Sequence, residues 1–259
     1  MIPILRQQAI VKHITDAKIV GIDKLAKILG VSSMTVRRDV QALEEAGYMV
    51  SLSRGMAIHK TTANTPLRFF YSEMSRPEMD QIAKAAEPLI RKGTTIYLDS
   101  GPTIMALARR LCEARGDESD LLIVTSDLAV AVQLIQNSNL RIYHTGGMVS
   151  RETNSCSGIG AAKALRGFSI DTSFLTTPSW NTRWLSTLDS EKSPLKKAAV
   201  TASHRCVLLS DSRKYGKLNA FKSIPMSSID LIVTDDGLPK CAIEAFEKQG
   251  TKLLIAPRK

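Results

Sequence analysis

The sequence contains few of the residues that build disulfide frameworks or metal sites. It has 4 cysteines and 4 histidines in 259 residues, no two cysteines form a CxxC pair, and the histidines have no metal-ligand spacing. We therefore expect reduced thiols and predict neither a metal nor a cofactor. No apolar run approaches the about 18 residues that a membrane-spanning helix needs, and the N-terminus does not have the pattern of a signal peptide. These absences favour a cytoplasmic protein with no membrane partner.

Aromatic residues are also scarce, at 5% of the chain. The interior must therefore be built mainly from Ile, Leu, Val, Ala and Met. Hydrophobic residues at 44% and charged residues at 23% are typical of globular proteins, and they argue against a disordered, collagen-like or coiled-coil chain. The length is sufficient for two domains.

Acidic residues are outnumbered by basic ones. The chain has 35 Lys and Arg against 25 Asp and Glu, which gives a formal net charge of +10 at pH 7. The pI calculated from the sequence is near 9.5. An excess of positive charge favours a polyanionic partner, and nucleic acid is the first candidate.

Residues 1–58 have the pattern of three helices followed by a β-hairpin. Gly30 follows the second helix at a position that suits a helix end, and Ser32 or Ser33 can cap the third helix with a side-chain oxygen. A tight turn between these helices is typical of a helix-turn-helix, and the hairpin would be its wing. The helices are expected at about 4–15, 22–29 and 33–46, and the hairpin strands at 48–52 and 56–58.

The third helix separates an apolar face from a polar face. Val36, Val40 and Leu43 fall on one side at spacings of four and three residues. The other side presents groups that read DNA: arginine for guanine or phosphate, glutamine for adenine, and threonine and methionine for the thymine methyl group. Asp39 is expected to orient an arginine, because a carboxylate would repel phosphate. We predict DNA contacts by Ser33, Met34, Thr35, Arg37, Arg38 and Gln41 on this helix and by Arg54 on the wing. A merely solvated helix face is the alternative, and it explains the order of elements less well.

Residues 59–75 are expected to form a linker, and residues 76–259 a larger domain of the α/β class. In that domain, near-continuous apolar strands alternate with helices, which is typical of a mostly parallel sheet covered on both faces. Strands are expected near 94–98, 121–124, 140–143, 173–175, 206–209, 231–233 and 253–255. Helices are expected near 79–90, 103–112, 128–136, 161–165, 195–202 and 242–248.

Small polar residues and glycines follow three of the predicted strands. Such loops offer backbone N–H groups and helix N-termini to an anion, at the edge where open α/β folds bind their ligands. Together the three loops favour a phosphate-bearing ligand. We predict effector contacts by Asp99, Ser100, Gly101 and Thr103 in the first loop, Thr125 and Ser126 in the second, and Gly146 and Gly147 in the third.

The stretch 22–44, IDKLAKILGVSSMTVRRDVQALE, resembles the helix-turn-helix of the DeoR family of bacterial sugar-metabolism regulators. The loops after the predicted strands resemble the family's sensor domain, which is similar in fold to ribose-5-phosphate isomerase. Lys196-Lys197-Ala198 and the stretch 211–216, DSRKYG, resemble two further segments of that domain. The resemblance covers nearly the whole chain. It implies a repressor with a phosphorylated sugar as effector, and effector contacts by Lys196, Asp211 and Lys214.

Three departures from the family pattern bear on the ligand rather than on the fold. Pro102 replaces a Thr or Ser, which removes one N–H donor from the first loop. The segment 177–180, TPSW, replaces a stretch that is usually small and glycine-rich, and Trp180 and Trp184 could line or block the pocket. The segment 191–194, EKSP, lacks the second acid of the usual Glu-Glu-Ala run.

Two other functions fit parts of the sequence. An aldose–ketose isomerase acting on a phosphosugar needs a carboxylate base and a donor that polarises the carbonyl, for which Asp99, Asp211 and Lys214 are the candidates. However, no acid and base stand at a recognisable spacing, and an isomerase has no use for a DNA-binding domain. An architectural DNA-binding protein would not need the large α/β domain.

We therefore predict a DNA-binding transcriptional regulator that is not an enzyme. By analogy with the family, we expect it to repress a carbohydrate-catabolism operon. Its partners would be double-stranded operator DNA, a small phosphorylated sugar, and further copies of itself in a dimer or tetramer, because such regulators usually pair DNA half-sites.

Overall fold

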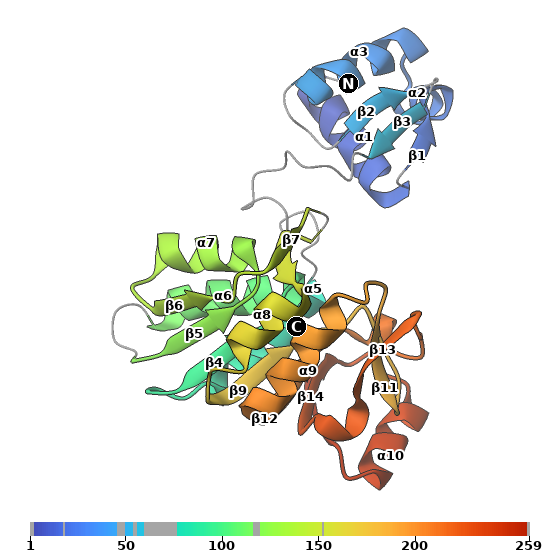
Figure 1. The fold of residues 1–259 in the computed structure, drawn as a ribbon. Helices are drawn as coiled ribbons and strands as arrows, with labels where there is room; N and C mark the ends of the chain where they lie inside the picture. The colour runs from blue at the N-terminus through green and yellow to red at the C-terminus, as the bar shows by residue number, and fades with distance from the viewer. Residues whose placement is uncertain are drawn as a thin grey trace. The chain divides into compact units, whose positions relative to one another are not determined.

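The chain forms two compact units, Met1–Pro66 and Leu67–Lys259, in a computed structural model (Figure 1). The structure describes residues 3–17, 19–45, 50–53, 56–59, 77–115, 120–151 and 153–257. The predicted linker lies outside these residues except for His59, so the predicted domain boundaries remain predictions.

The first unit combines three helices with a small antiparallel sheet (Figure 1). Its elements are α1 (Pro3–Ala17), β1 (Ile19–Gly21), α2 (Ile22–Leu29), α3 (Ser33–Glu45), β2 (Val50–Ser53) and β3 (Met56–His59). The strand order is β1-β3-β2. The predicted hairpin is confirmed as β2 and β3. β1 was not predicted, because a strand of three residues is too short to show a periodic pattern.

The turn between α2 and α3 follows from two residues. Gly30 adopts a left-handed φ of 65°, which favours glycine, and its N–H donates to the carbonyl of Ala26 at the end of α2. Ser32 accepts the N–H of Thr35 on its hydroxyl at 3.1 Å and so caps α3. The buried side of α3 then packs into the apolar core of this unit through Val36, Val40 and Leu43, as predicted.

The second unit is built on a seven-stranded sheet in which all neighbouring strands are parallel. The strand order is β15-β14-β12-β9-β4-β5-β6. The predicted parallel sheet is therefore confirmed. The strands are β4 (Thr95–Leu98), β5 (Leu122–Thr125), β6 (Arg141–His144), β9 (Ile170–Leu175), β12 (Ser203–Leu209), β14 (Leu231–Asp235) and β15 (Lys252–Ala256).

Helices cover both faces of this sheet (Figure 1). One face carries α5 (Pro77–Ala86), α6 (Pro102–Arg115) and α7 (Leu128–Asn137), and the other carries α8 (Gly158–Leu165), α9 (Lys192–Ala202) and α10 (Lys240–Lys248). Successive strand residues point to opposite faces, so Ile96 and Leu98 of β4 join the first core and Tyr97 joins the second. The helix expected near 161–165 is α8, which begins earlier, at Gly158.

Other elements depart from the sequence prediction. The helix expected over 79–90 ends at Ala86, and a 3-10 turn, η1 (Glu87–Leu89), follows it because Pro88 cannot continue an α-helix. Further elements are the hairpin of β7 (Met148–Ser150) and β8 (Ser155–Ser157), the antiparallel sheet of β10 (Ser179–Trp180), β11 (Trp184–Thr187) and β13 (Phe221–Pro225), and the 3-10 turns η2 (Ser212–Lys214) and η3 (Met226–Ser228). In the described segments no helix is long and apolar enough to cross a bilayer.

Trp180 belongs to the apolar core of the second unit. Its side chain is fully buried and stacks on Phe246 with ring centroids 5.8 Å apart, while Tyr215 meets it edge-on at 5.1 Å. Trp180 therefore contributes to the packing of the core, and its expected role at a pocket stays a prediction. Trp184 is half-buried, and the ammonium of Lys222 lies 5.4 Å from the centre of its ring.

Candidate functional site

The polar face of α3 is exposed as the helical period predicts. Met34 is 69% exposed, and Arg37, Arg38 and Gln41 are exposed beside it. Ser33 and Thr35, at the start of the helix, are half-buried. Arg54, the predicted wing contact, lies outside the described residues and stays a prediction.

The polar residues of α3 differ in their hydrogen bonds, and Gln41 donates to a carboxylate oxygen of Glu45 on the same helix at 3.1 Å. Ser33 donates to a carboxylate oxygen of Asp23 on α2 at 2.6 Å, and the Thr35 hydroxyl bonds that of Ser32 at 2.8 Å, so these side chains stabilise the turn itself. In the described part of the chain, Arg37 and Arg38 make no hydrogen bond or ion pair. Their guanidinium groups are therefore available to a partner outside the protein.

Asp39 fixes the orientation of α3 against α1. Its carboxylate is buried and accepts two hydrogen bonds from the guanidinium of Arg6, at 2.5 and 3.1 Å. A paired, two-bond arrangement of this kind is rigid as well as favourable. The carboxylate thus orients an arginine, as expected, but one on α1 rather than Arg37 or Arg38.

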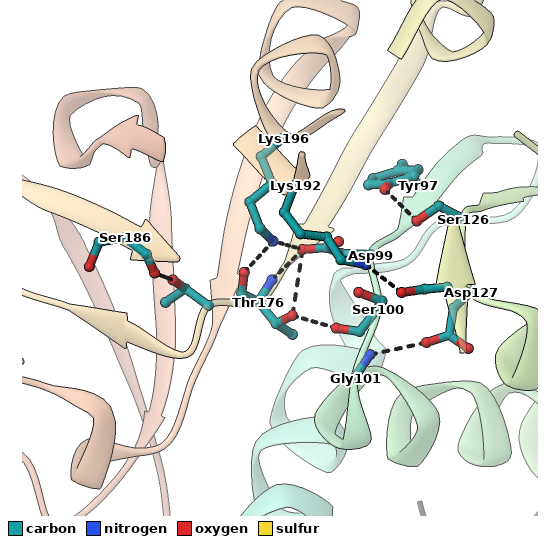
Figure 2. A network of polar contacts seen from close by, with 12 residues as sticks. Tyr97, Asp99, Ser100, Gly101, Ser126, Asp127, Thr176, Ser186, Lys192 and Lys196 are labelled. Atoms are coloured by element: carbon teal, nitrogen blue, oxygen red, sulfur yellow. Dashed lines mark hydrogen bonds and ion pairs between the residues drawn. The ribbon is translucent and has the colours of Figure 1, made fainter. Parts of the chain in front are cut away.

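In the second unit, the strand order changes direction between β4 and β9. From β4 the chain proceeds to β5 and β6 on one side, and then returns to β9, β12, β14 and β15 on the other. Open parallel sheets bind ligands beyond the carboxyl ends of the strands at such a switch point. The residues that follow β4, β5 and β9 form one polar cluster there, together with side chains from β8 and α9 (Figure 2). We call it the Asp99 cluster.

Asp99 is the centre of this cluster. It directly follows β4, is 2% exposed, and accepts the N–H of Thr176 at 3.0 Å. The ammonium of Lys196, from α9, donates to the same Asp99 oxygen and to the carbonyl of Thr176 at 2.6 Å. The Thr176 hydroxyl donates to the carbonyl of Ser100 at 2.6 Å. The structure thus brings the predicted Asp99, Ser100 and Lys196 together across the switch point.

Asp127 binds the backbone donors of the first two loops. One of its carboxylate oxygens accepts the N–H groups of Ala129 and Val130 and so caps α7. The other accepts the N–H of Gly101 at 3.2 Å. These N–H groups are therefore already satisfied, and the anion cradle expected at the first two loops has fewer available donors than the sequence suggests.

The side chains predicted in these loops are also buried. Thr125 accepts the N–H of Asp127 at 3.1 Å, and the Ser126 hydroxyl bonds the Tyr97 hydroxyl at 3.1 Å. Burial raises the pKa of Tyr97 well above its usual value and keeps the phenol protonated. The hydroxyl of Thr103, at the start of α6, is buried and has no hydrogen-bond partner among the described residues.

The glycines of the third loop differ from each other. Gly146 has a φ of 65° with open space where a Cβ would be. Gly147 has a φ of 113°, and a Cβ there would lie 2.8 Å from the carbonyl oxygen of Ser157 and 2.9 Å from the Cβ of Ala161. Gly147 is therefore required for the close approach of this loop to α8.

Asp211 and Lys214 lie after β12, which is separated from β4 by β9. Their charged groups are 3.5 Å apart, and Arg213 donates to the other Asp211 oxygen at 2.9 Å. Burial lowers the pKa of Lys214, while Asp211 opposes this shift and Lys196 adds to it. Within the described residues, the charged partner of Lys214 is thus Asp211.

Four residues of the cluster were missed by sequence reasoning: Asp127, Ser155, Thr176 and Lys192. The capping role of Asp127 could have been predicted, because an Asp directly before a helix is a common N-cap. Lys192 lies on α9 and donates to the hydroxyl of Ser155 in β8. Within the described ranges, no group of three His, Cys, Asp or Glu side chains is placed to hold a metal ion.

Comparison with known proteins identifies both units. Residues 6–62 match the sequence model of the DeoR-like helix-turn-helix domain, and residues 75–236 match that of the DeoR C-terminal sensor domain. An uncharacterized HTH-type transcriptional regulator, YgbI, of Escherichia coli strain K12 is 39% identical over 256 residues, which is 99% of each chain. A putative aga operon transcriptional repressor of E. coli O157:H7 is 27% identical over 253 residues, 96% of this chain and 93% of the relative.

Among solved structures, ribose 5-phosphate isomerase A of Methanocaldococcus jannaschii is similar over 53% of each chain, with a TM-score of 0.40 and 17% identity. This likeness bears on neither activity nor substrate. The matched domains and the relatives are those of regulators, so the isomerase alternative is set aside. The chain belongs to the DeoR family: it is a transcriptional regulator with a helix-turn-helix DNA-binding domain and a sensor domain.

Proposed function

We propose that this regulator represses a carbohydrate-catabolism operon and that a phosphorylated sugar, bound in the second unit, controls its affinity for the operator. The repressor assignment is supported by the name of the E. coli O157:H7 relative. The effector class is supported by the buried ammonium groups at the switch point of the sheet. Because its partner is chromosomal DNA, the protein is expected to act in the cytoplasm.

In the DNA-bound state, α3 would lie in the major groove. Arg37 and Arg38 have the fork geometry for guanine or phosphate, Gln41 can pair with adenine, and Met34 can contact a thymine methyl group. Ser33 and Thr35 would approach the DNA backbone at the start of the helix, while they also hold the turn. Arg54 would contact the backbone or the minor groove from the wing.

In the sensor, the effector would bind beyond the ends of β4, β5 and β6. The carboxylate of Asp99 can accept sugar hydroxyls, and Lys196 and Lys214 can pair with a phosphate. The unpartnered Thr103 hydroxyl, at the start of a 14-residue helix, is a further donor for an anion. The remaining proposed contacts are Ser100, Gly101, Thr125, Ser126, Gly146, Gly147 and Asp211.

The effector must bind the conformation that has low affinity for the operator better than it binds the conformation that has high affinity. Equal affinity for both would leave the equilibrium between the two conformations unchanged. A dimer or tetramer would place two α3 helices on adjacent half-sites of an operator. Each half-site would then be read by one copy of the chain.

The observation that carries this proposal is that Arg37 and Arg38 on α3 are exposed and make no hydrogen bond or ion pair in the described part of the chain. The test is titration of the purified protein against DNA from upstream of its own gene and of the adjacent operon, with a shuffled control sequence at the same salt concentration. We expect the upstream DNA to bind about a thousandfold or more tightly than the control. Binding to neither DNA would contradict the proposal.

A further inference from the structure

Helix α9 carries two buried lysines on one face. Lys192 and Lys196 are four residues apart, so their side chains leave the helix one turn apart in the same direction. Their side chains are almost inaccessible, with residue exposures of 8% and 5%. Figure 2 shows both side chains reaching into the cluster around Asp99.

The two ammonium groups have different partners. Lys196 donates to the carboxylate of Asp99 and to the carbonyl of Thr176, so it has both a counter-charge and two acceptors. Lys192 donates only to the hydroxyl of Ser155, and no carboxylate of a described residue lies within 4.0 Å of its ammonium. An ammonium carries three N–H donors, so two of those on Lys192 have no acceptor in the described part of the protein.

Such an arrangement is costly for the protein alone. A buried charge is tolerated when it is paired and hydrogen-bonded, and Lys192 has one neutral partner. Burial lowers the pKa of Lys192; Asp99, Asp127 and Asp189 oppose this shift and Lys196 adds to it. An anion held against Lys192 would supply the missing acceptors and offset the cost of burying its charge.

We propose that the effector carries a second anionic group besides its phosphate, and that Lys192 binds this second group. The inference rests on the phosphorylated effector proposed above. A carboxylate at the end of the sugar chain or a second phosphoryl group supplies the required chemistry. Lys192 thereby selects phosphorylated sugar acids or sugar bisphosphates over ordinary aldose phosphates.

The test compares ligands that differ only at C1. Erythrose 4-phosphate, ribose 5-phosphate and glucose 6-phosphate are each set beside the aldonate made by oxidation of the aldehyde, and the bisphosphate arm uses glucose 1,6-bisphosphate and ribose 1,5-bisphosphate. Binding to the full chain is followed by isothermal calorimetry and by the rise in unfolding temperature. Both tryptophans belong to the second unit, so tryptophan fluorescence follows its unfolding.

The wild-type protein should bind at least one of the doubly anionic ligands about tenfold to hundredfold more tightly than the matching aldose phosphate, since a charge-assisted hydrogen bond contributes that much. Lys192→Met should remove this preference and leave the affinity for the aldose phosphate within about threefold, because the phosphate contacts are kept. Lys197→Met is the matched control: it removes an exposed lysine from the same helix and should change neither affinity. Lys192→Glu should reverse the preference.

Equal binding of aldose phosphates and doubly anionic ligands by the wild-type protein would overturn this inference and leave the phosphorylated effector standing. The inference would also be overturned if Lys192→Met lowered the affinity for both kinds of ligand to the same extent. If no phosphorylated ligand binds the wild-type protein, the proposed effector class fails, and the inference fails with it. The comparison of ligands on the wild-type protein needs no variant, so it decides the question even if Lys192→Met does not fold.

Discussion

The two units place their candidate cations in opposite environments. On α3, Arg37 and Arg38 are exposed and make no ion pair within the described chain. On α9, Lys192 and Lys196 are buried, and Lys196 is paired with Asp99. An exposed face suits a large polyanion that approaches from outside, whereas a buried cluster suits a small anion that it can enclose.

The contrast leads to different consequences of substitution. Removing an exposed cation should weaken DNA binding and leave the free energy of unfolding nearly unchanged. Removing the buried, paired Lys196 should first change the free energy of unfolding, because Asp99 is left buried without a counter-charge. The expectations below are ordered by the size of the effect.

The largest effect is expected from Lys196→Met. This change leaves the Asp99 carboxylate buried without its ammonium partner and should lower the free energy of unfolding of the second unit by about 3 kcal/mol or more. Chemical denaturation followed by tryptophan fluorescence measures it. The double variant Asp99→Asn, Lys196→Met should recover part of the loss, and the exposed Lys197→Met should lose almost nothing. Equal stability of Lys196→Met and wild type would show that the pair is not buried as described.

A smaller effect, confined to DNA binding, is expected from Arg37→Ala and Arg38→Ala. Each should cost about 1–3 kcal/mol of operator binding if the guanidinium contacts a base. The unfolding temperature should not move, because neither side chain has a partner in the described chain. Lys12→Ala, an exposed cation on α1, is the control in the same titration. If both arginine variants bind the operator like the wild type at fixed salt, the assignment of α3 as the DNA reader is wrong.

Alanine substitutions of the two glycines of the third loop should differ in their cost to stability, because Gly147 is closely packed and Gly146 is not. Gly147→Ala should destabilise the second unit by about 1–3 kcal/mol, since the new Cβ meets the Ser157 carbonyl at 2.8 Å and the backbone is left-handed. Gly146→Ala has open space and should cost about 1 kcal/mol from its backbone conformation alone. Thermal unfolding of both variants checks the order, and a larger loss for Gly146→Ala would contradict the packing role of Gly147.

The smallest effect expected is a pH dependence of the free energy of unfolding that is due to Lys192. Burial lowers the pKa of Lys192 in the folded protein below the usual 10.5. Between that lowered pKa and pH 10.5, the unfolded chain therefore binds more protons than the folded one. The free energy of unfolding should therefore rise with pH as pH approaches 10.5. The charged groups around it are Asp99, Asp127, Asp189 and Lys196. Lys192→Met should lack this part of the rise and Lys197→Met should keep it; identical pH profiles for Lys192→Met and wild type would exclude the effect.

The first unit was largely predictable because its signals are local. The spacing of Val36, Val40 and Leu43 fixes which side of α3 is buried, and the exposed side then follows from the helical period. What could not be predicted there is the partner of Asp39. Arg6 lies 33 residues earlier on another helix, and only the packing of α1 on α3 brings the two together.

The second unit was predictable in its strands but not in its polar contacts. Apolar runs located the parallel strands, and the loops after them located the sheet edge. The partners of Asp99, however, come from 77 and 97 residues further along the chain, so no spacing rule relates them. Lys192 appeared in the sequence only as part of a segment that lacks an acid, and its burial depends on how α9 packs in the fold.

The central claim is that occupancy of the Asp99 cluster changes the affinity of α3 for its operator. The direct measurement is the operator affinity of the full chain with and without the phosphorylated ligand that most stabilises the second unit. At saturating ligand, operator affinity should fall by about fivefold to 150-fold, and operator DNA should weaken ligand binding by the same factor. An operator affinity that is unchanged at saturating ligand would contradict the claim, because it would mean that the two sites are not coupled.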